Sequence, residues 1–528
     1  MIRLPHHIRI TSALPKFTRS LTVHTRTWKD YLLSDTAILV WMAVALIILH
    51  CLTNNQYGFH RDELNFIEDG RHLAWGYVDC PPFTPFVAHI AEMLFGTSLV
   101  GIRFFPAVAQ GLVLVLTGLM VRRMGGNRWA QVIAAAGVAI SAVSLNQGSI
   151  FMYVSFDFLW WVVVAYGVIS LLKTNDARWW LVIGAAIGLG MMTKLTMGFL
   201  VAGLVAGVLF TPARRYLKSP WLWAGVAVSL LIFLPNFVWM AQHDFISLQK
   251  LSFIHARDVG DGYYKWFLLD QLYSAANPSS IFLWAMGLYF FWRSASEPNY
   301  RPLVWMYAVP LAGFLALQGR GYYLAPAYPM LIAGGAYYIG ERVRNLAPAQ
   351  RNDQYSWLYY SLVIGGLCAA SVTMPVVPVN SFWWKMADGI HQLYREEIGW
   401  PEMAKTVADI RNTVPLEERS RLGILAGNYG EAGAINVYGP AYNLPHAISG
   451  IDSFWLWGYG DPPPETVIVL GLEPSYASSL FETCSIAGTI TNPYGIQNEE
   501  TQDHPYILLC RHLRQPWEQF WKNFHSFG

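Results

Sequence analysis

The sequence predicts a mainly α-helical protein that crosses a membrane about eleven times and carries a C-terminal α/β domain. Of its 528 residues, 54% are hydrophobic and only 13% are charged, whereas soluble domains contain about 25% charged residues. So much apolar surface exceeds what one soluble core absorbs, because such cores stop growing beyond about 250–300 residues. From residue 377 onwards, the apolar runs become too short to cross a bilayer and are separated by Gly- and Pro-rich turns.

The predicted transmembrane domain covers residues 1–376. Its spans are apolar windows of roughly 17–25 residues, the length that crosses a bilayer. They lie near residues 34–53, 99–121, 129–148, 154–172, 178–193, 195–211, 219–240, 277–293, 302–318, 324–341 and 356–376. The weakest division is the one between the fifth and sixth spans.

The predicted α/β domain covers residues 377–528. Its strands and helices follow from short apolar runs at Leu422–Ala426, Thr466–Leu470 and Tyr506–Cys510 and from helical stretches near 395–412 and 430–438. Cys484 and Cys510 both belong to this domain, where they either form a disulfide or are two buried strand residues. Glu431 lies at the start of the second helical stretch, where it either contacts an acceptor or stabilises the first turn of the helix.

The distribution of basic residues predicts the orientation of the spans. Short cytoplasmic loops carry an excess of Lys and Arg, and the segment 1–30 is itself basic. The loops that would share its side contain Arg122, Arg123, Arg128, Lys173, Arg178, Arg214, Arg215, Lys218, Arg293, Arg301, Arg342, Arg344 and Arg351. An N-terminus in the cytoplasm followed by eleven spans places the C-terminal domain outside the cytoplasm.

Composition also excludes several classes of partner. The net charge is only +2, so no general basic field exists to attract nucleic acid. Five cysteines are too few for a disulfide scaffold, and no Cys or His spacing indicates a structural metal.

The first outer loop, residues 54–98, contains two amphipathic segments separated by Cys80-Pro81-Pro82. Both are too short to cross a bilayer, and we expect them to lie in the membrane interface. Asp62 and Glu63 open the first segment. They are either an acidic cap at a helix start or carboxylates held at the membrane surface, where one could serve as a general base.

Other ionisable residues stand at the ends of spans on this same outer face. Asp157 lies in the first turn of the fourth span, where an acid is costly and generally faces a cavity, partner or functional site, although an N-cap role is possible. Lys194 lies between the fifth and sixth spans, as either a snorkelling lysine or an anion-binding group. The remaining members of this set are Arg320, Tyr322 and Tyr323 in a late outer turn, and His243, His255, Arg257 and Lys265 in loop 241–276. Cations near the headgroup plane beside a base suit a lipid phosphate that carries a sugar.

The motifs along the chain are HRDEL, GRHLAWGYVDCPP, RRMGG, TPARR, YYLAPAYP and NYGEAGAINVYG. As a set they resemble the bacterial branch of the GT-C membrane glycosyltransferases of the protein O-mannosyltransferase family, which includes the aminoarabinose transferases. The resemblance implies a bacterial inner-membrane enzyme that takes a sugar from a polyprenyl phosphate, such as undecaprenyl phosphate. The implied acceptor is lipid A or lipopolysaccharide, another glycan, a lipid or a protein.

Site residues follow from the same resemblance. Asp62, Glu63 and Asp157 correspond to catalytic acids of the family. The expected carrier-phosphate and sugar site consists of Lys194, Arg320, Tyr322, Tyr323, His255 and Arg257. Leu195 stands where a glycine often follows the lysine, and Arg320 stands where a lysine is more usual.

The expected chemistry is a single inverting displacement at the anomeric carbon. Asp62 takes the proton of the acceptor hydroxyl, Glu63 or Asp157 orients the acceptor or the base, and Lys194 and Arg320 stabilise the leaving phosphate. No cofactor is required, although the paired acids could bind a divalent metal. One alternative is a transporter or flippase of lipid-linked sugars, whose inverted repeats are not found in this sequence. Another is a lipid-glycan ligase, in which basic residues concentrate in one large late outer loop.

Overall fold

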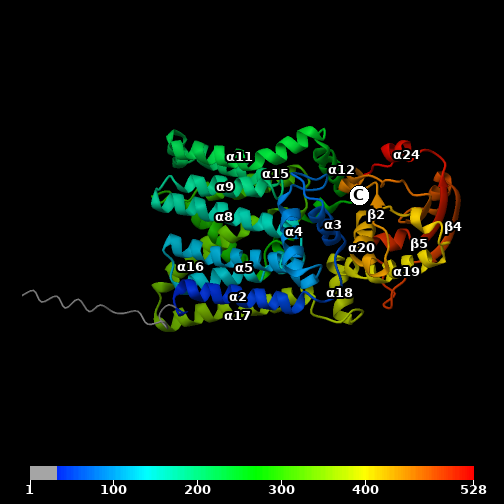
Figure 1. The fold of residues 1–528 in the computed structure, drawn as a ribbon. Coiled ribbons are helices and arrows are strands. Elements are labelled where there is room, and N and C mark those ends of the chain that lie inside the picture. The colour runs from blue at the N-terminus through cyan, green and yellow to red at the C-terminus, as the bar shows by residue number, and fades with distance from the viewer. Residues whose placement is uncertain (1–31) are drawn as a thin grey trace, which may run out of the picture.

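The structure of the protein, a computed structural model, describes residues 32–528. The basic segment 1–30, on which part of the predicted orientation depends, lies outside these residues. Most of the chain forms a bundle of helices that lie side by side, and a small α/β unit stands at one end of the bundle (Figure 1).

Within residues 32–528, five helices are long and apolar enough to cross a membrane, and they coincide with five of the predicted spans. They are α2 (Asp35–Thr53), α5 (Leu99–Met124), α8 (Tyr153–Thr174), α11 (Pro220–Gln242) and α17 (Pro348–Thr373). Helix α10 (Met197–Leu209) and the 3₁₀ helix η1 (Pro212–Lys218) would add a sixth span if counted together, with a bend of 99° between them.

The other predicted spans are helical but shorter than expected. They correspond to α6 (Arg128–Ala139) with α7 (Ala142–Gln147), α9 (Trp179–Met191), α10, α14 (Ile281–Arg293), α15 (Pro302–Ala316) and α16 (Tyr328–Arg344). The window 129–148 is broken because Ser141 caps a new helix, its hydroxyl accepting from the N–H of Ser144. The total of eleven spans therefore stays a prediction.

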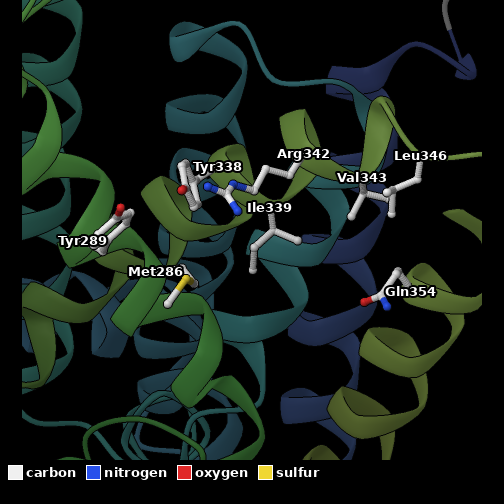
Figure 2. Close-up of a pocket in the computed structure, with 8 residues that line it drawn as sticks. All are labelled: Met286, Tyr289, Tyr338, Ile339, Arg342, Val343, Leu346 and Gln354. Carbon is white, nitrogen blue, oxygen red and sulfur yellow. The ribbon is translucent and has the colours of Figure 1, made fainter. Parts of the chain in front are cut away.

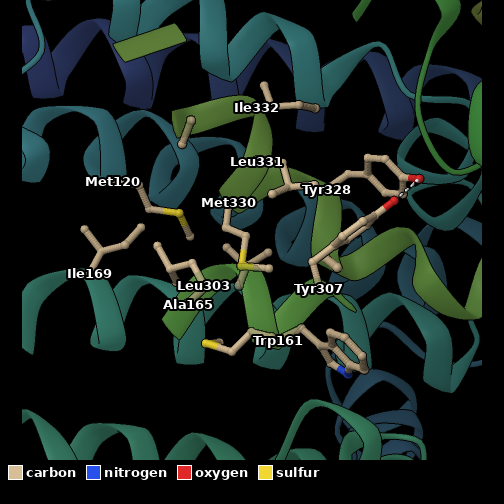
Figure 3. Close-up of a cluster of buried hydrophobic side chains, with 14 of the residues drawn as sticks. Met120, Trp161, Ala165, Ile169, Leu303, Tyr307, Tyr328, Met330, Leu331 and Ile332 are labelled. Carbon is tan, nitrogen blue, oxygen red and sulfur yellow. Dashed lines mark hydrogen bonds between the residues drawn. The ribbon is translucent and has the colours of Figure 1, made fainter. Parts of the chain in front are cut away.

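The middle of the bundle is tightly packed. Figure 3 shows side chains of α5, α8, α15 and α16 meeting around Met330, among them Met120, Trp161 and Leu303. Helices α14 and α16 approach so closely that a Cβ on Gly287 would lie 1.8 Å from the carbonyl oxygen of Leu331. Small residues permit such close backbone contact between membrane helices.

The first outer loop contains α3 (Arg61–Arg71) and α4 (Phe83–Phe95), as the two amphipathic segments predict. Helix α4 exposes Phe86, Met93 and Leu94, which suits a membrane interface. The expectation that α3 also lies in the interface is wrong, because residues 63–70 are all buried. A Cβ on Gly433 of helix α20 (Tyr429–Tyr438) would lie 2.8 Å from the Cβ of Leu64, so α20 covers α3 directly.

The α/β unit is built on a five-stranded sheet of order β2-β1-β3-β5-β4. Its strands are β1 (Leu422–Ala426), β2 (Ala447–Ser449), β3 (Thr466–Leu470), β4 (Phe481–Thr489) and β5 (Tyr506–Leu513). Strand β1 is parallel to both β2 and β3, whereas β5 is antiparallel to β3 and β4. The three predicted strands are confirmed, and Cys484 forms a disulfide with Cys510, its partner across the β4–β5 pair.

Several helices pack around this sheet or connect it to the bundle. They are α18 (Phe382–His391), α19 (Trp400–Thr413), α20, α21 (Asp452–Trp457), α22 (Pro474–Leu480), α23 (Glu499–Asp503) and α24 (Trp517–Asn523). The outer loop 241–276 forms α12 (Ile246–Gly260) and α13 (Phe267–Tyr273), and the Tyr-rich turn forms the 3₁₀ helix η4 (Gly321–Ala327). Helices α3 and α12 lie between the bundle and the sheet (Figure 1).

Candidate active site

Asp62 stands in the first turn of α3, at the junction of the bundle with the α/β unit. Its Oδ1 accepts a hydrogen bond of 2.9 Å from the Tyr429 hydroxyl, and its Oδ2 lies 3.8 Å from His60 Nδ1. The Asp62 side chain is 26% exposed, so it remains accessible. Burial raises the pKa of Asp62, but the neighbouring His60 and Arg61 and the Tyr429 hydrogen bond outweigh it, leaving the pKa below its ordinary value. Asp62 is therefore an ionised, accessible carboxylate.

Glu63, in contrast, is fully enclosed. Its carboxylate lies 2.6 Å from Arg103 Nη2 and accepts hydrogen bonds from the N–H groups of His60 and Phe151. With His60 it forms a capping box at the start of α3. These contacts fix the helix that carries Asp62. They suit positioning, and they do not support the predicted catalytic role of Glu63.

Asp157 is buried in the first turns of α8. Its carboxylate accepts hydrogen bonds from Trp161 Nε1 at 3.1 Å and from the hydroxyl of Thr196 at 3.3 Å. Thr196 follows Lys194 by two residues, and the charges of Asp157 and Lys194 are close enough to interact. The N-cap interpretation is wrong, because Met152 is the N-cap and α8 has no side-chain cap hydrogen bond.

Lys194 lies within a group of three tyrosine rings. Its Nζ is 4.2 Å from the ring centre of Tyr323, 5.0 Å from that of Tyr153 and 5.3 Å from that of Tyr322. Such contacts stabilise an ammonium group electrostatically. Lys194, Tyr322 and Tyr323, which the sequence assigns to one expected site, thus lie next to one another, together with Tyr153, which the sequence does not single out.

Arg320, directly before η4, lies in the same site, and its positive charge is paired with a carboxylate. It binds the buried Asp258 of α12 through two guanidinium nitrogens, one at 2.6 Å, and stacks over the Tyr263 ring at 4.5 Å. Bidentate pairing of this kind fixes the orientation of the guanidinium.

Tyr153 joins the two halves of the site. It contacts Lys194 through its ring and packs edge-to-face against Phe66 of α3. Its hydroxyl lies close enough to Asp62 and Arg320 to feel both charges. Asp62, Lys194 and Arg320 thus all lie around Tyr153.

Two predicted site residues of α12 lie at the outside of this neighbourhood, although the charge of Arg257 still acts on Tyr323. His255 is exposed on α12 and makes no hydrogen bond or ion pair within residues 32–528. Arg257 is 39% exposed and binds the backbone oxygen of Gly528, with Asp258 at 3.8 Å. Helical spacing explains the difference, because Asp258 points inwards to Arg320 while its neighbours on α12 point outwards.

Other residues of the site carry no local sequence signal. Lys250 of α12 is nearly buried and lies 2.8 Å from Asp452 of the α/β unit. Arg103 bridges Glu63 and Glu397, the latter at 3.3 Å. Burial raises the pKa of Glu397 to about 8 despite the nearby Arg103. These partners are hundreds of residues apart or belong to different structural units, so spacing along the chain could not reveal them.

Among the described residues, one group could hold a metal ion next to Asp62. The ligand atoms of Asp69, Asp79 and Cys80 lie within 4.8 Å of one another, and Oδ1 of the buried Asp69 has no hydrogen-bond partner. Asn65 donates a hydrogen bond of 2.9 Å to Asp79. Burial raises the pKa of Asp69 well above its ordinary value, and Asp79 adds to this rise. The group therefore holds either protons or a cation.

A cavity of about 520 Å³ lies elsewhere in the bundle, between α14, α16 and α17. Figure 2 shows Tyr289 and Met286 of α14 beside Tyr338 and Arg342 of α16, with Gln354 of α17 across from them. These residues of α16 lie at the end opposite to η4, which precedes the helix. The cavity is therefore not part of the site around Asp62.

Comparison with known proteins supports the resemblance seen in the motifs. Residues 79–239 match the family described as dolichyl-phosphate-mannose-protein mannosyltransferase. The fold matches the crystal structure of ArnT from Cupriavidus metallidurans in the apo state, with a TM-score of 0.55 and 15% identity over 90% of this chain and 98% of that one. The chain therefore shares the fold of ArnT and resembles the mannosyltransferase family over residues 79–239.

Two curated relatives are similar to this chain over about half of its length. One is the lipid A galacturonosyltransferase RgtD of Rhizobium johnstonii, 26% identical over 51% of this chain and 56% of the relative. The other is the undecaprenyl phosphate-alpha-4-amino-4-deoxy-L-arabinose arabinosyl transferase 1 of Pseudomonas fluorescens, 27% identical over 48% of this chain and 47% of the relative. The chain thus spans about half the length of the curated relatives it matches.

Proposed function

We propose that this protein is a GT-C membrane glycosyltransferase, an inverting enzyme that moves a sugar from undecaprenyl phosphate to lipid A or a related envelope acceptor. The observation that carries the proposal is the pairing of an accessible, ionised Asp62 with the cation Lys194 on either side of Tyr153. A base and a fixed cation are the two groups that a displacement with a leaving phosphate needs. The names of the two curated relatives supply the donor and acceptor classes.

In the proposed reaction, the acceptor hydroxyl oxygen forms a bond to the anomeric carbon while the bond from that carbon to the phosphate oxygen breaks. Asp62 takes the hydroxyl proton, and the phosphate leaves with the bonding electrons. Lys194 and Arg320 face the negative charge that gathers on the phosphate, and Tyr322 and Tyr323 supply hydroxyl donors. One displacement inverts the configuration at the anomeric carbon.

Neighbouring residues hold these groups in place. Thr196 donates to Asp157, which fixes the turn that carries Lys194. Glu63 and Arg103 fix the start of α3, and Asp258 orients Arg320. In this proposal Glu63 and Asp157 are positioning residues.

We further propose that the site and the α/β unit lie on the periplasmic side of a bacterial inner membrane, with residues 377–528 forming a domain there. The Cys484–Cys510 disulfide supports this side, because disulfides persist in oxidising compartments. A basic residue at the far end of the bundle also supports this orientation, because short cytoplasmic loops are rich in Lys and Arg. Lys173, in the last turn of α8, donates a hydrogen bond to the backbone oxygen of Met124 at the end of α5. The site lies at the opposite end, next to the α/β unit.

The test uses full-length protein in lipid nanodiscs with undecaprenyl phosphate that carries galacturonic acid, aminoarabinose or a neutral hexose, and with lipid A as acceptor. We expect a glycosylated lipid A together with released undecaprenyl phosphate for one of these donors. Movement of the intact lipid-linked sugar across vesicles, without cleavage of its phosphate bond, would favour a transporter and contradict the proposal. Glu482→Gln is a suitable control, because Glu482 is an exposed acid of β4 in the α/β unit.

A further inference from the structure

A second acidic site lies in the α/β unit, at the carboxyl ends of the parallel strands β1 and β3. Gly427 follows β1 and Gly471 follows β3. Chain connections leave this point for opposite edges of the sheet, since β1 leads to β2 at one edge and β3 leads to β4 at the other. In open α/β sheets, ligands bind in the crevice outside such a switch point.

A cavity of about 200 Å³ occupies this crevice. Its lining is almost entirely polar and acidic, consisting of Gly427, Asn428, Glu431, Gly471, Glu499, Glu500, Asp503 and His504. The acids come from two elements that are distant in sequence, the first turn of α20 and the short helix α23. The cavity therefore brings carboxylates from two distant segments of the chain together.

Glu431 is the unexplained residue of this cavity. It is completely buried, and within residues 32–528 it has no ion-pair or side-chain hydrogen-bond partner. Besides the neighbouring acids, the polar groups close to its carboxylate are the backbone N–H groups of Gly427 and Asn428. Its carboxylate presses against the backbone of Gly471, where a Cβ would lie 2.1 Å from Oε2. Burial of a carboxylate without an ion-pair partner is costly, and here it raises the pKa of Glu431 to about 8, with Glu500 adding to the rise.

The neighbouring acids are only partly compensated. Arg61 binds Glu499 at 2.6 Å and Oε1 of Glu500 at 3.0 Å, but Oε2 of the buried Glu500 has no partner. The buried Nδ1 of His504 has none either. The Arg61 guanidinium thus pairs with both Glu499 and Glu500. The atoms without a partner, Glu500 Oε2 and His504 Nδ1, belong to residues that line the cavity.

We propose that this cavity binds a divalent cation of the oxygen-preferring class, Ca²⁺ or Mg²⁺, through Glu431 and Glu500. Asp503 is exposed, and Glu499 is exposed although it also binds Arg61; both can complete the ligand set with water. Carboxylate oxygens in an irregular arrangement suit these cations. This site is distinct from the Asp69, Asp79 and Cys80 group beside Asp62.

The cation has a structural consequence. Arg61, which binds Glu499 and Glu500, directly precedes Asp62, and Tyr429, which binds Asp62, directly follows Asn428 of the cavity. A bound cation therefore ties α20 and α23 to the start of α3. Its binding stabilises the α/β unit against the bundle, whatever sugar the enzyme transfers.

The test measures thermal unfolding of full-length protein in detergent after treatment with EDTA, then with increasing Ca²⁺ or Mg²⁺. We expect saturable stabilisation by at least one of the two cations. Glu431→Gln and Glu500→Gln should each weaken the apparent cation affinity at least about tenfold, since each removes a charged ligand. Glu482→Gln, at an exposed acid of β4, is the matched control and should keep the wild-type response.

Three results would overturn the proposal. One is an unfolding temperature that neither cation changes, which would mean that Glu431 simply retains a proton. Another is stabilisation that survives both glutamine variants but disappears in Asp79→Asn, which would assign the cation to the group beside Asp62. The third is stabilisation by Zn²⁺ alone that depends on His504. Because unfolding is the readout, failure of this site remains distinguishable from failure of the proposed transferase activity.

Discussion

The hydroxyl of Tyr429 donates a hydrogen bond of 2.9 Å to Asp62, although 367 residues separate the two in the chain. Asp62 belongs to the loop after the first membrane helix, and Tyr429 begins α20 of the α/β unit. The α/β unit therefore supplies a direct partner to the proposed base. This contact makes the unit part of the active site in the proposed mechanism.

Replacing Tyr429 with Phe should slow sugar transfer about tenfold, because one hydrogen bond to a charged group is worth about 1.5–3 kcal/mol. The Tyr429 hydrogen bond lowers the pKa of Asp62, so its loss raises that pKa. Since the base must be ionised, the acidic limb of the pH–rate profile should move to higher pH. An unchanged profile with unchanged rate would show that the contact does not affect the base.

The buried pair of Glu63 and Arg103 should govern stability. Removing one partner of a buried ion pair costs about 3–5 kcal/mol, because the other charge is left uncompensated. Arg103→Met should therefore lower the unfolding temperature sharply, and the double variant with Glu63→Gln should recover part of the loss. A stable but inactive Glu63→Gln protein would instead restore a direct catalytic role for Glu63.

Lys194→Gln should reduce transfer about 10²–10³-fold, the usual effect of removing one group that stabilises developing negative charge. Lys194→Arg should retain part of the activity, because the positive charge remains. The matched control is Lys173→Gln, because Lys173 lies in the last turn of α8, at the end of the helix opposite to Tyr153. Steady-state kinetics with varied donor provides the measurement, and equal rates for Lys194→Gln and wild type would remove Lys194 from the mechanism.

The disulfide should contribute to the stability of the α/β unit. Cys484 and Cys510 are 26 residues apart, and closing a loop of this length stabilises a fold by about 3 kcal/mol in the chain-entropy model. The double serine variant should unfold at a lower temperature, whereas Cys368→Ser, at an exposed free cysteine, should not. Equal unfolding temperatures for all three proteins would show that the bond is dispensable.

Local sequence pattern predicted the parts of the structure that depend on local chemistry. Apolar windows located the helices, and short apolar runs located β1, β3 and β5. Lys194 and Tyr323 could be assigned to one site because both stand at helix ends on the same face. The helix boundaries were harder, since a single capping residue such as Ser141 divides a continuous apolar window.

Contacts between distant segments could not be predicted from the sequence. The burial of α3 depends on Gly433, which lets α20 approach it, and the orientation of Arg320 depends on Asp258 of another helix. The enclosed state of Glu63 follows from Arg103, 40 residues later in the chain. In each case the decisive partner belongs to another element, so composition and spacing carried no signal for it.

The most direct test of the central claim is the single-turnover rate of sugar transfer by Asp62→Asn, compared with wild type and with Asp261→Asn. Asp261 is an exposed acid of the outer loop 241–276 that lies outside the proposed machinery. The account predicts that Asp62→Asn folds normally and loses transfer by about 10²-fold or more, the effect of a general base, while Asp261→Asn remains active. Full transfer by a folded Asp62→Asn protein would contradict it.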